Sequence, residues 1–399
     1  MLKWIRNRLV GYEVFFQHEG RWRLEAVTDD EDAAVALARK ALGSGGTLSA
    51  RVVRQRSMLN GFTTETVIFE DAVQAREKPV VVASPSQPTP LCATVADLCE
   101  DAGRQVVGQV LKDYLARNNL TATELLHGWS HARRLQDKGG GIVTAAIHRT
   151  ATAQAATTGT SVKDRVKELI GLVDQATGLA RDFAAERKRL PPFQGADIAA
   201  YARTVQAAVG EDRYAYAMRS LLTVWLFEIS SLPGKLDSVV ELMEQPDIDE
   251  PLMRLLDGIA ADTLIFADVI QDVFGARSNL AGFLCALAGF LQGRQVGGMS
   301  PGAARLSGLI GRGVAPLCRQ VLTARLVQEI ASDKPLDKLN PAADGTLIEE
   351  LTTALMQGNG EMFGGEAVRK AMSIRRLRNR QDVLRAKGLH AVADNLRAE

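Results

Sequence analysis

Three residues with metal-binding side chains lie at helical spacing in the motif Glu124-x-x-His127-x-x-x-His131. Positions i, i+3 and i+7 share one face of a helix, so a continuous helix would bring the carboxylate and the two imidazoles together. A carboxylate-bridged metal centre also needs Glu-x-x-His contributions from a second helix, and the chain contains no other Glu-x-x-His. Thr121 and Glu124 form a capping box, which explains the glutamate as part of a helix start. We therefore predict no bound metal, with a metal-dependent enzyme that uses residues 124–131 as an alternative.

A second motif, Gly298-Met299-Ser300-Pro301-Gly302, matches the G-x-S-x-G pattern of the nucleophile elbow in α/β-hydrolases. That elbow follows a strand, whereas a glycine-rich helical stretch precedes Ser300, and His390 is the only histidine after it. Ser300 as an N-cap with Pro301 in the first helical turn accounts for the same residues. The stretches 138–141 and 233–235 lack the spacing of a phosphate-binding P-loop. We predict no catalytic residue, no cofactor and no enzymatic activity.

Charge is segregated along the chain although the net charge is only +1. Segment 237–272 holds ten acidic residues against Arg254 alone, and segment 369–399 holds nine basic residues against three acidic ones. Complementary charges favour docking, within one chain or between copies; two independently solvated faces are the alternative. The predicted partner-binding residues are Asp247, Asp249, Glu250 and Asp257 on the acidic segment and Arg375, Arg376, Arg378, Arg380 and Arg385 on the basic one.

Both ends of the chain are basic and amphipathic. Residues Trp4, Ile5, Arg6 and Arg8 resemble a short interfacial membrane anchor, which alone would bind a bilayer only marginally and reversibly; packing of segment 1–10 on its own sheet is the other interpretation. The arginines of the C-terminal helix could contact phosphates through counterion release. Because no aromatic residue accompanies them and no helix-turn-helix pattern precedes them, nucleic-acid binding is not favoured. Membrane-surface binding remains an alternative.

The composition is that of an ordinary globular protein, with 46% apolar and 24% charged residues in 399. The four cysteines form no C-x-x-C pair, which favours reduced, buried thiols. No segment is long and apolar enough to span a bilayer: the most apolar stretch, 278–292, is too short and is predicted to be a buried helix. The basic N-terminus lacks the apolar region of a secretory signal. We therefore expect a cytoplasmic protein.

The pattern of apolar residues changes at the proline-rich stretch 77–91. Before it, Tyr12, Val14 and Phe16 alternate, as do Trp22, Leu24 and Ala26, which predicts a hairpin with these residues on one face. A helix and two further strands complete a ββαββ antiparallel module over 11–76. After the stretch, helical periodicity continues to the C-terminus. We expect a helical pair over 92–138, a Gly/Ala/Thr-rich connection over 139–160, and an all-α region over 161–399 that forms a bundle or irregular solenoid.

Two modules, a tether and many amphipathic helices favour binding over catalysis. The sequence therefore predicts a non-enzymatic scaffold or signalling adaptor that contacts other proteins, and that self-associates through its acidic 237–272 and basic 369–399 surfaces. A peripheral membrane or nucleic-acid-associated protein is the alternative from another class.

Overall fold

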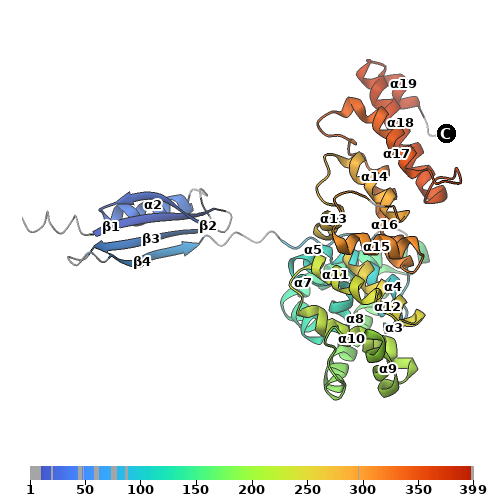
Figure 1. Cartoon of the computed structure of the whole chain (residues 1–399), viewed down its shortest axis with the longest axis horizontal. Helices are drawn as coiled ribbons and strands as arrows, with labels where there is room; N and C mark the ends of the chain where they lie inside the picture. The colour runs from blue at the N-terminus through green and yellow to red at the C-terminus, as the bar shows by residue number, and fades with distance from the viewer. Residues whose placement is uncertain are drawn as a thin grey trace, which may run out of the picture. The chain divides into compact units, whose positions relative to one another are not determined.

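The computed structural model describes residues 10–18, 21–43, 47, 49–57, 63–72, 79–85, 89–294 and 296–396. The chain forms two compact units, Met1–Pro79 and Val80–Glu399 (Figure 1). The first is a four-stranded antiparallel sheet with one helix, and the second is all helical. The predicted fold class is confirmed.

The sheet of the first unit has the strand order β2-β1-β3-β4, with every neighbouring pair antiparallel. Its elements are β1 (Val10–His18), β2 (Arg21–Thr28), α2 (Glu31–Gly43), β3 (Ser49–Ser57) and β4 (Thr63–Ala72). Small side chains on α2, Ala34 and Ala38, let the helix lie close against Val14 and Val52 of the central strands. One face of the sheet therefore forms the core of this unit.

A β-bulge in this unit corrects the predicted face of the hairpin. The register shifts between Val14 and Phe15, so that Ala26 pairs with Val14 while Leu24 pairs with Phe15. Cross-strand partners point to the same side of a sheet, and one extra residue reverses the alternation beyond the bulge. Trp22 and Leu24 consequently lie on the face opposite α2, not on the core face with Ala26.

The helical unit contains helices of 5 to 30 residues. Within the described residues they are α3 (Val95–Cys99), α4 (Asp101–Val110), α5 (Lys112–Arg117), α6 (Ala122–His127), α7 (Trp129–Thr158), α8 (Val162–Glu186), α9 (Ile198–Val209), α10 (Glu211–Phe227), α11 (Leu232–Met243), α12 (Glu250–Thr263), α13 (Ala267–Phe274), α14 (Leu280–Leu291), α15 (Pro301–Gly311), α16 (Pro316–Ala331), α17 (Asp344–Leu355), α18 (Gly365–Ala386) and α19 (His390–Asn395). Short 3₁₀ turns lie at Arg187–Arg189 and Pro341–Ala343.

The helical unit begins inside the stretch expected to be a tether. The Val81 amide donates to Asp113 Oδ2 at 2.7 Å, and the Ala83 amide donates to Val110 O at 3.0 Å. Further along, Gln154 Nε2 donates to the carbonyl of Pro90. Prolines prevent this segment from forming a helix, but an extended chain can still pack through its backbone. The boundary of the helical unit therefore lies at Val80 rather than near residue 92.

Two helix boundaries also differ from expectation. The continuous helix that would carry Glu124, His127 and His131 breaks at Gly128, whose amide closes α6 on Glu124 O and whose backbone is extended. By contrast, α7 continues through the predicted 139–160 connection, with a kink at Gly139 (φ −122°, ψ 25°). Helix α7 packs along α8, and this tertiary packing holds the glycine-rich stretch in a helix against its local propensity.

The main core of the helical unit takes buried side chains from α5 through α18, and a second, smaller core lies between α3, α7 and α8. The apolar helix α14 is almost entirely buried, as its sequence predicted. No helix among the described residues is long and apolar enough to cross a membrane.

Candidate functional site

A buried arginine, Arg104, stands at the junction of α3 and α4. The two helices meet at Glu100, whose extended backbone turns the chain and leaves the carbonyl of Cys99 without an intrahelical donor. Arg104 Nη1 donates to that carbonyl at 3.0 Å, and Nη2 donates to Asp101 Oδ1 at 2.9 Å. Although it is an arginine, only 1% of it is exposed. Its guanidinium therefore stabilises the turn between α3 and α4 through hydrogen bonds to Cys99 and Asp101.

Asp262 of α12 is the second centre of this site. Its Oδ2 atom accepts from Arg104 Nε at 3.1 Å, from the Thr123 amide at 3.0 Å and from Thr123 Oγ1 at 2.6 Å. One carboxylate thus ties α12 to α4 and to the first turn of α6, where a negative charge also interacts favourably with the helix dipole. We call Asp101, Arg104, Arg219 and Asp262 the arginine–aspartate cluster.

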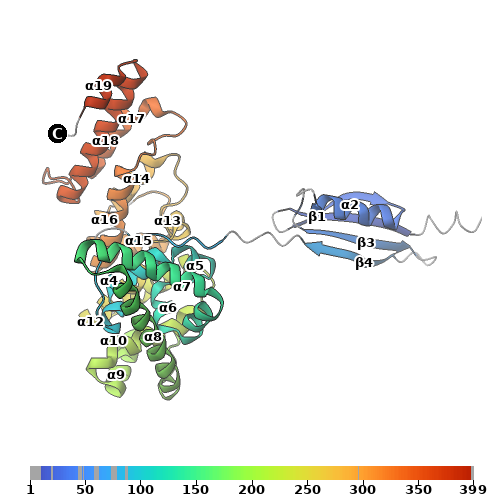
Figure 2. The same ribbon diagram turned by 180° about the vertical axis from the view of Figure 1, so that it is seen from behind.

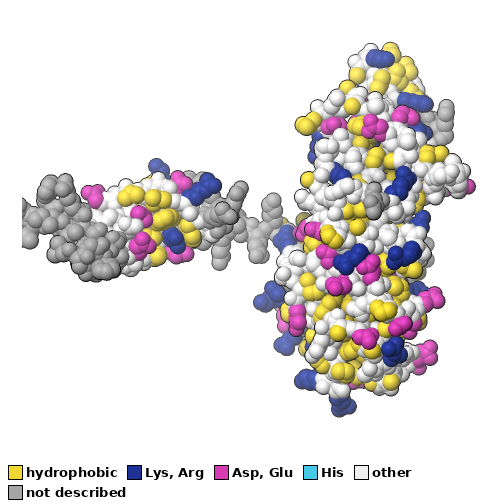
Figure 3. All heavy atoms as spheres, in the orientation of Figure 1, with side chains coloured by type: hydrophobic (Ala, Val, Ile, Leu, Met, Phe, Trp, Pro, Cys, Tyr) yellow, Lys and Arg dark blue, Asp and Glu magenta, His cyan; other side chains and the backbone are white. Residues whose placement is uncertain are grey.

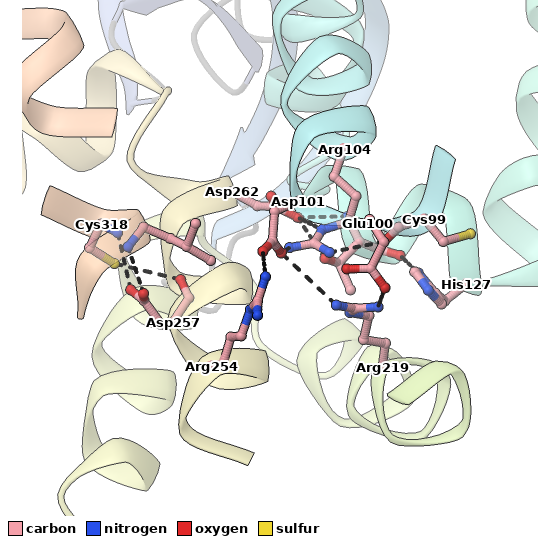
Figure 4. Close-up of polar contacts among 12 residues, drawn as sticks. Cys99, Glu100, Asp101, Arg104, His127, Arg219, Arg254, Asp257, Asp262 and Cys318 are labelled. Atoms are coloured by element: carbon pink, nitrogen blue, oxygen red, sulfur yellow. Dashed lines mark hydrogen bonds and ion pairs between the residues drawn. The ribbon is translucent and has the colours of Figure 1, made fainter. Parts of the chain in front are cut away.

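Figure 4 shows how Arg219 completes this cluster and how Arg254 flanks it. Arg219 of α10 lies 3.6 Å from Glu100 and 3.9 Å from Asp101, and Arg254 lies 3.9 Å from Asp101 on the outer side. Gly258 makes room for the arrangement, since a Cβ there would stand 2.5 Å from Arg104 Nη2. The two arginines and two aspartates of the cluster come from α4, α10 and α12 and leave no net charge at the centre.

Polar side chains that could carry acid–base chemistry lie next to the cluster. His127 is buried, its Nδ1 lies 2.9 Å from Thr123 O, and its ring lies 4.8 Å from that of Tyr216. His127 Nε2, Tyr216 OH, Arg219 Nε and Thr223 Oγ1 are buried and have no hydrogen-bond partner among the described residues. The Nδ1 contact to a carbonyl assigns the proton to Nδ1 and leaves Nε2 as the free acceptor.

The titration of these groups is moved away from neutrality. Burial, supported by the charge of Arg219, lowers the pKa of His127 to about 3. Burial raises the pKa of Cys99 to about 11 and raises that of Tyr216 above its usual range. General acid–base catalysis works best when the pKa lies near the working pH. This arrangement therefore favours neutral, fixed side chains over proton transfer.

The candidate metal ligands Glu124, His127 and His131 do not lie on one continuous helix. His131 lies in α7, beyond the break at Gly128, and contacts the ring of Phe227. Glu124 accepts from the Thr121 amide at 2.8 Å in the predicted capping box and from Lys235 Nζ at 2.6 Å. Within the described part of the chain, no group of three His, Cys, Asp or Glu residues could hold a metal ion.

Two of the predicted partner-binding residues are buried and cap the same helix. Asp257 Oδ2 accepts from the Leu317 amide at 2.7 Å and Oδ1 from the Cys318 amide at 3.1 Å, at the N-terminus of α16. At its C-terminus, Arg375 donates to the carbonyls of Ile330 and Glu329 at 2.8 and 2.9 Å. Asp257 is 0% exposed and Arg375 4%. Each charge complements the helix dipole, so their assignment to a docking surface is wrong.

The other charged candidates are at least partly accessible, but several have partners within the chain. Arg376 donates to Thr352 Oγ1, Arg378 donates to Ala331 O, and Arg385 pairs with Asp382 and Asp394. Asp249 caps α12 through the Leu252 amide. Asp247, Glu250 and Arg380 are exposed. Helix α18 packs on α16 and α17, and Figure 3 shows basic and acidic side chains interspersed on the visible face of the helical unit.

Ser300 is the N-cap of α15 and accepts from the Ala303 amide at 3.2 Å, with Pro301 in the first turn. The structural interpretation of the G-x-S-x-G motif is thereby confirmed. The membrane candidates Trp4, Ile5, Arg6 and Arg8 lie outside the described residues.

A cation–π stack on the first unit was not among the predicted site residues. The guanidinium carbon of Arg51 lies 5.1 Å from the ring centre of Phe15 and 4.6 Å from that of Trp22, on the sheet face opposite α2. The pairing register extends this face in two cross-strand rows. The rows are Leu24, Phe15, Arg51 and Glu70, and Val27, Glu13, Val53 and Val67. The alternation of side chains along the strands predicts which residues share a face, but the register shift between Val14 and Phe15 changes the face that Trp22 occupies. Alternation alone therefore did not predict the stack.

Comparison of the chain with protein-family models, curated proteins and solved structures finds no match. The function must therefore be argued from the geometry described above.

Proposed function

We propose that this protein is a non-enzymatic adaptor that binds another protein on the uncovered face of its N-terminal sheet. The observation that carries the proposal is the exposure of apolar side chains on that face: Leu24 is 50% exposed, Val27 64% and Val67 49%. In the described part of this unit, α2 is the only helix, and it covers the opposite face (Figure 1). An apolar, aromatic-containing patch of this kind is typical of a protein–protein interface.

The charges on this face indicate the chemistry of the partner. Glu13 lies in the row of Val27 and Val67, Glu70 lies in the row of Leu24, and Glu65 follows on β4. The one basic residue in the two rows, Arg51, is stacked between two rings. A complementary partner presents apolar side chains flanked by lysine or arginine. The occupant we propose is such a basic amphipathic segment of another protein.

Two further observations support this proposal. The first concerns catalysis and the second concerns the redox state of the compartment. The buried Cys99, His127 and Tyr216 have pKa values moved away from neutrality, mainly by burial. Cys92, Cys99, Cys285 and Cys318 are all unpaired thiols, which fits the cytoplasm.

The test measures binding of a short fluorescein-labelled peptide of alternating leucine and lysine to the full chain by fluorescence anisotropy. A double variant, Val27→Glu with Val67→Glu, should weaken binding by about tenfold or more, equivalent to 1.4 kcal/mol. The matched control is Leu37→Glu on α2, at a residue also exposed, and it should bind like the unmodified protein. A leucine–glutamate peptide should not bind.

Equal binding by the double variant, or equal binding of the acidic peptide, would refute the docking surface. Light scattering of the same samples at low and high salt measures their mass and tests the alternative of self-association. A salt-sensitive oligomer with no peptide binding would favour self-association through exposed charges such as Asp247, Glu250 and Arg380 instead.

A further inference from the structure

An apolar cavity of about 120 Å³ lies in the helical unit between α4, α6, α7 and α8. Figure 2 shows these four helices gathered in the same part of the unit. The residues that line the cavity come from these helices, from α3 and from the segment before it. Most of them are aliphatic, among them Leu135, Val143, Ala146 and Ile147 of α7.

The lining defines the chemistry of a ligand. Among the described residues around the cavity none is charged or aromatic, and four are polar. Gln136 and Gln154 are already engaged: Gln136 Nε2 donates to Thr177 Oγ1 at 3.0 Å, and Gln154 is held by Pro90 O and by Arg165 Nε. These bonds direct the Gln136 amide to Thr177 and the Gln154 amide to Pro90 and Arg165. The space between them is walled by aliphatic side chains, so its ligand is aliphatic.

The size of the cavity limits the ligand. An engineered apolar cavity of about 150 Å³ remains dry and binds benzene, so this one accommodates a hydrocarbon group of roughly five or six carbons. A group of this size would make dispersion contacts with the aliphatic lining.

A glycine-rich kink in α7 lies beside the cavity. Gln136 lines it just before the kink at Gly139, and Val143 lines it just after. Beyond the kink, Gly140 and Gly141 have open space where a Cβ would stand, so no steric contact requires glycine there. Alanine would favour the helix at both positions, whereas glycine lowers the cost of local opening. Val106 and Val173 of the lining are partly exposed, which places the cavity near the surface.

We propose that this cavity is a binding site for a short aliphatic chain, which enters by local opening of α7 at Gly139–Gly141. The chain is either a free small aliphatic molecule or the end of a longer acyl chain, and the experiment separates the two sources. This site is independent of the sheet face on the first unit, so either proposal can fail alone.

The test follows the methyl resonances of Val143 and Ile147 by NMR in the full chain, with 1-hexanol and with dodecanoate as probes. Saturable shifts with 1-hexanol support a small ligand, and saturable shifts with dodecanoate alone support an acyl chain. Ala146→Leu adds volume to the lining and should weaken binding by about tenfold or more. Ala145→Leu adds the same group at a position outside the lining and should leave binding unchanged.

A second pair of variants tests the entry route. Gly140→Ala with Gly141→Ala should slow ligand exchange several-fold, while Gly178→Ala, at another unobstructed helical glycine on α8, should not. Unchanged exchange in the double variant would overturn the entry route. The binding site itself is overturned if neither probe gives saturable shifts, or if Ala146→Leu binds as tightly as Ala145→Leu.

Discussion

The buried ion pair between Lys235 and Glu124 gives a quantitative test of how the helical unit uses charge. Both side chains are almost fully buried, and Lys235 Nζ lies 2.6 Å from Glu124 Oε1. Replacing Lys235 by methionine keeps most of the aliphatic stem but leaves the carboxylate without its cation. Removing one partner of a buried pair costs about 3–5 kcal/mol. We expect the free energy of unfolding of Lys235→Met to fall by an amount in that range near neutral pH.

The loss should depend on pH with a defined sign. Burial raises the pKa of Glu124, and Lys235 opposes this rise, so the variant should raise the pKa further. When the folded state holds a proton that the unfolded state has released, stability falls as pH rises, by at most about 1.4 kcal/mol per pH unit. Lys235→Met should therefore lose stability more steeply than the unmodified protein between about pH 5 and 8.

The assay is urea unfolding followed by circular dichroism at several pH values. In Lys235→Met with Glu124→Gln, the pH dependence from this site should disappear and part of the stability should return, because glutamine still completes the capping box. The control Arg213→Met breaks an exposed pair with Glu186 and should cost about 1 kcal/mol or less. A loss below about 1 kcal/mol for Lys235→Met, or a loss that does not vary with pH, would refute the reasoning.

Two further predictions concern buried charges and the buried histidine. Asp257→Ala and Arg375→Met should each destabilise the protein by about 1–3 kcal/mol, because each leaves backbone groups at one end of α16 unpaired. The control Arg380→Met, at an exposed residue, should not change stability. Thermal unfolding measures all three variants, and unchanged stability of Asp257→Ala and Arg375→Met would contradict the capping roles. His127, whose pKa burial lowers to about 3, should show no NMR titration between about pH 5 and 8. As the pH falls, His127 is protonated in the unfolded chain before it is protonated in the folded protein. His127 should therefore lower the free energy of unfolding below about pH 6.5, by at most about 1.4 kcal/mol per pH unit. A titration of His127 near pH 6.5 in the folded protein would contradict this.

The features that sequence predicted correctly are local ones. The ββαββ order, the capping box at Thr121 and Glu124, the N-cap at Ser300 and the burial of the apolar helix at 280–291 all follow from spacing within a few residues. Side-chain alternation, helical periodicity and capping act over such distances, so one segment contains the information for each.

The features that sequence did not predict depend on distant residues. A bulge in one strand decided which face carries Trp22 and Leu24, and packing against α8 kept α7 helical through its glycines. Arg104 meets Asp262, Lys235 meets Glu124, and Arg375 meets Ile330 across separations of 158, 111 and 45 residues. Charge counted along the chain suggested two opposed surfaces. Whether a charge is solvated or caps a helix depends on which distant backbone group it meets, and only the tertiary structure decides that.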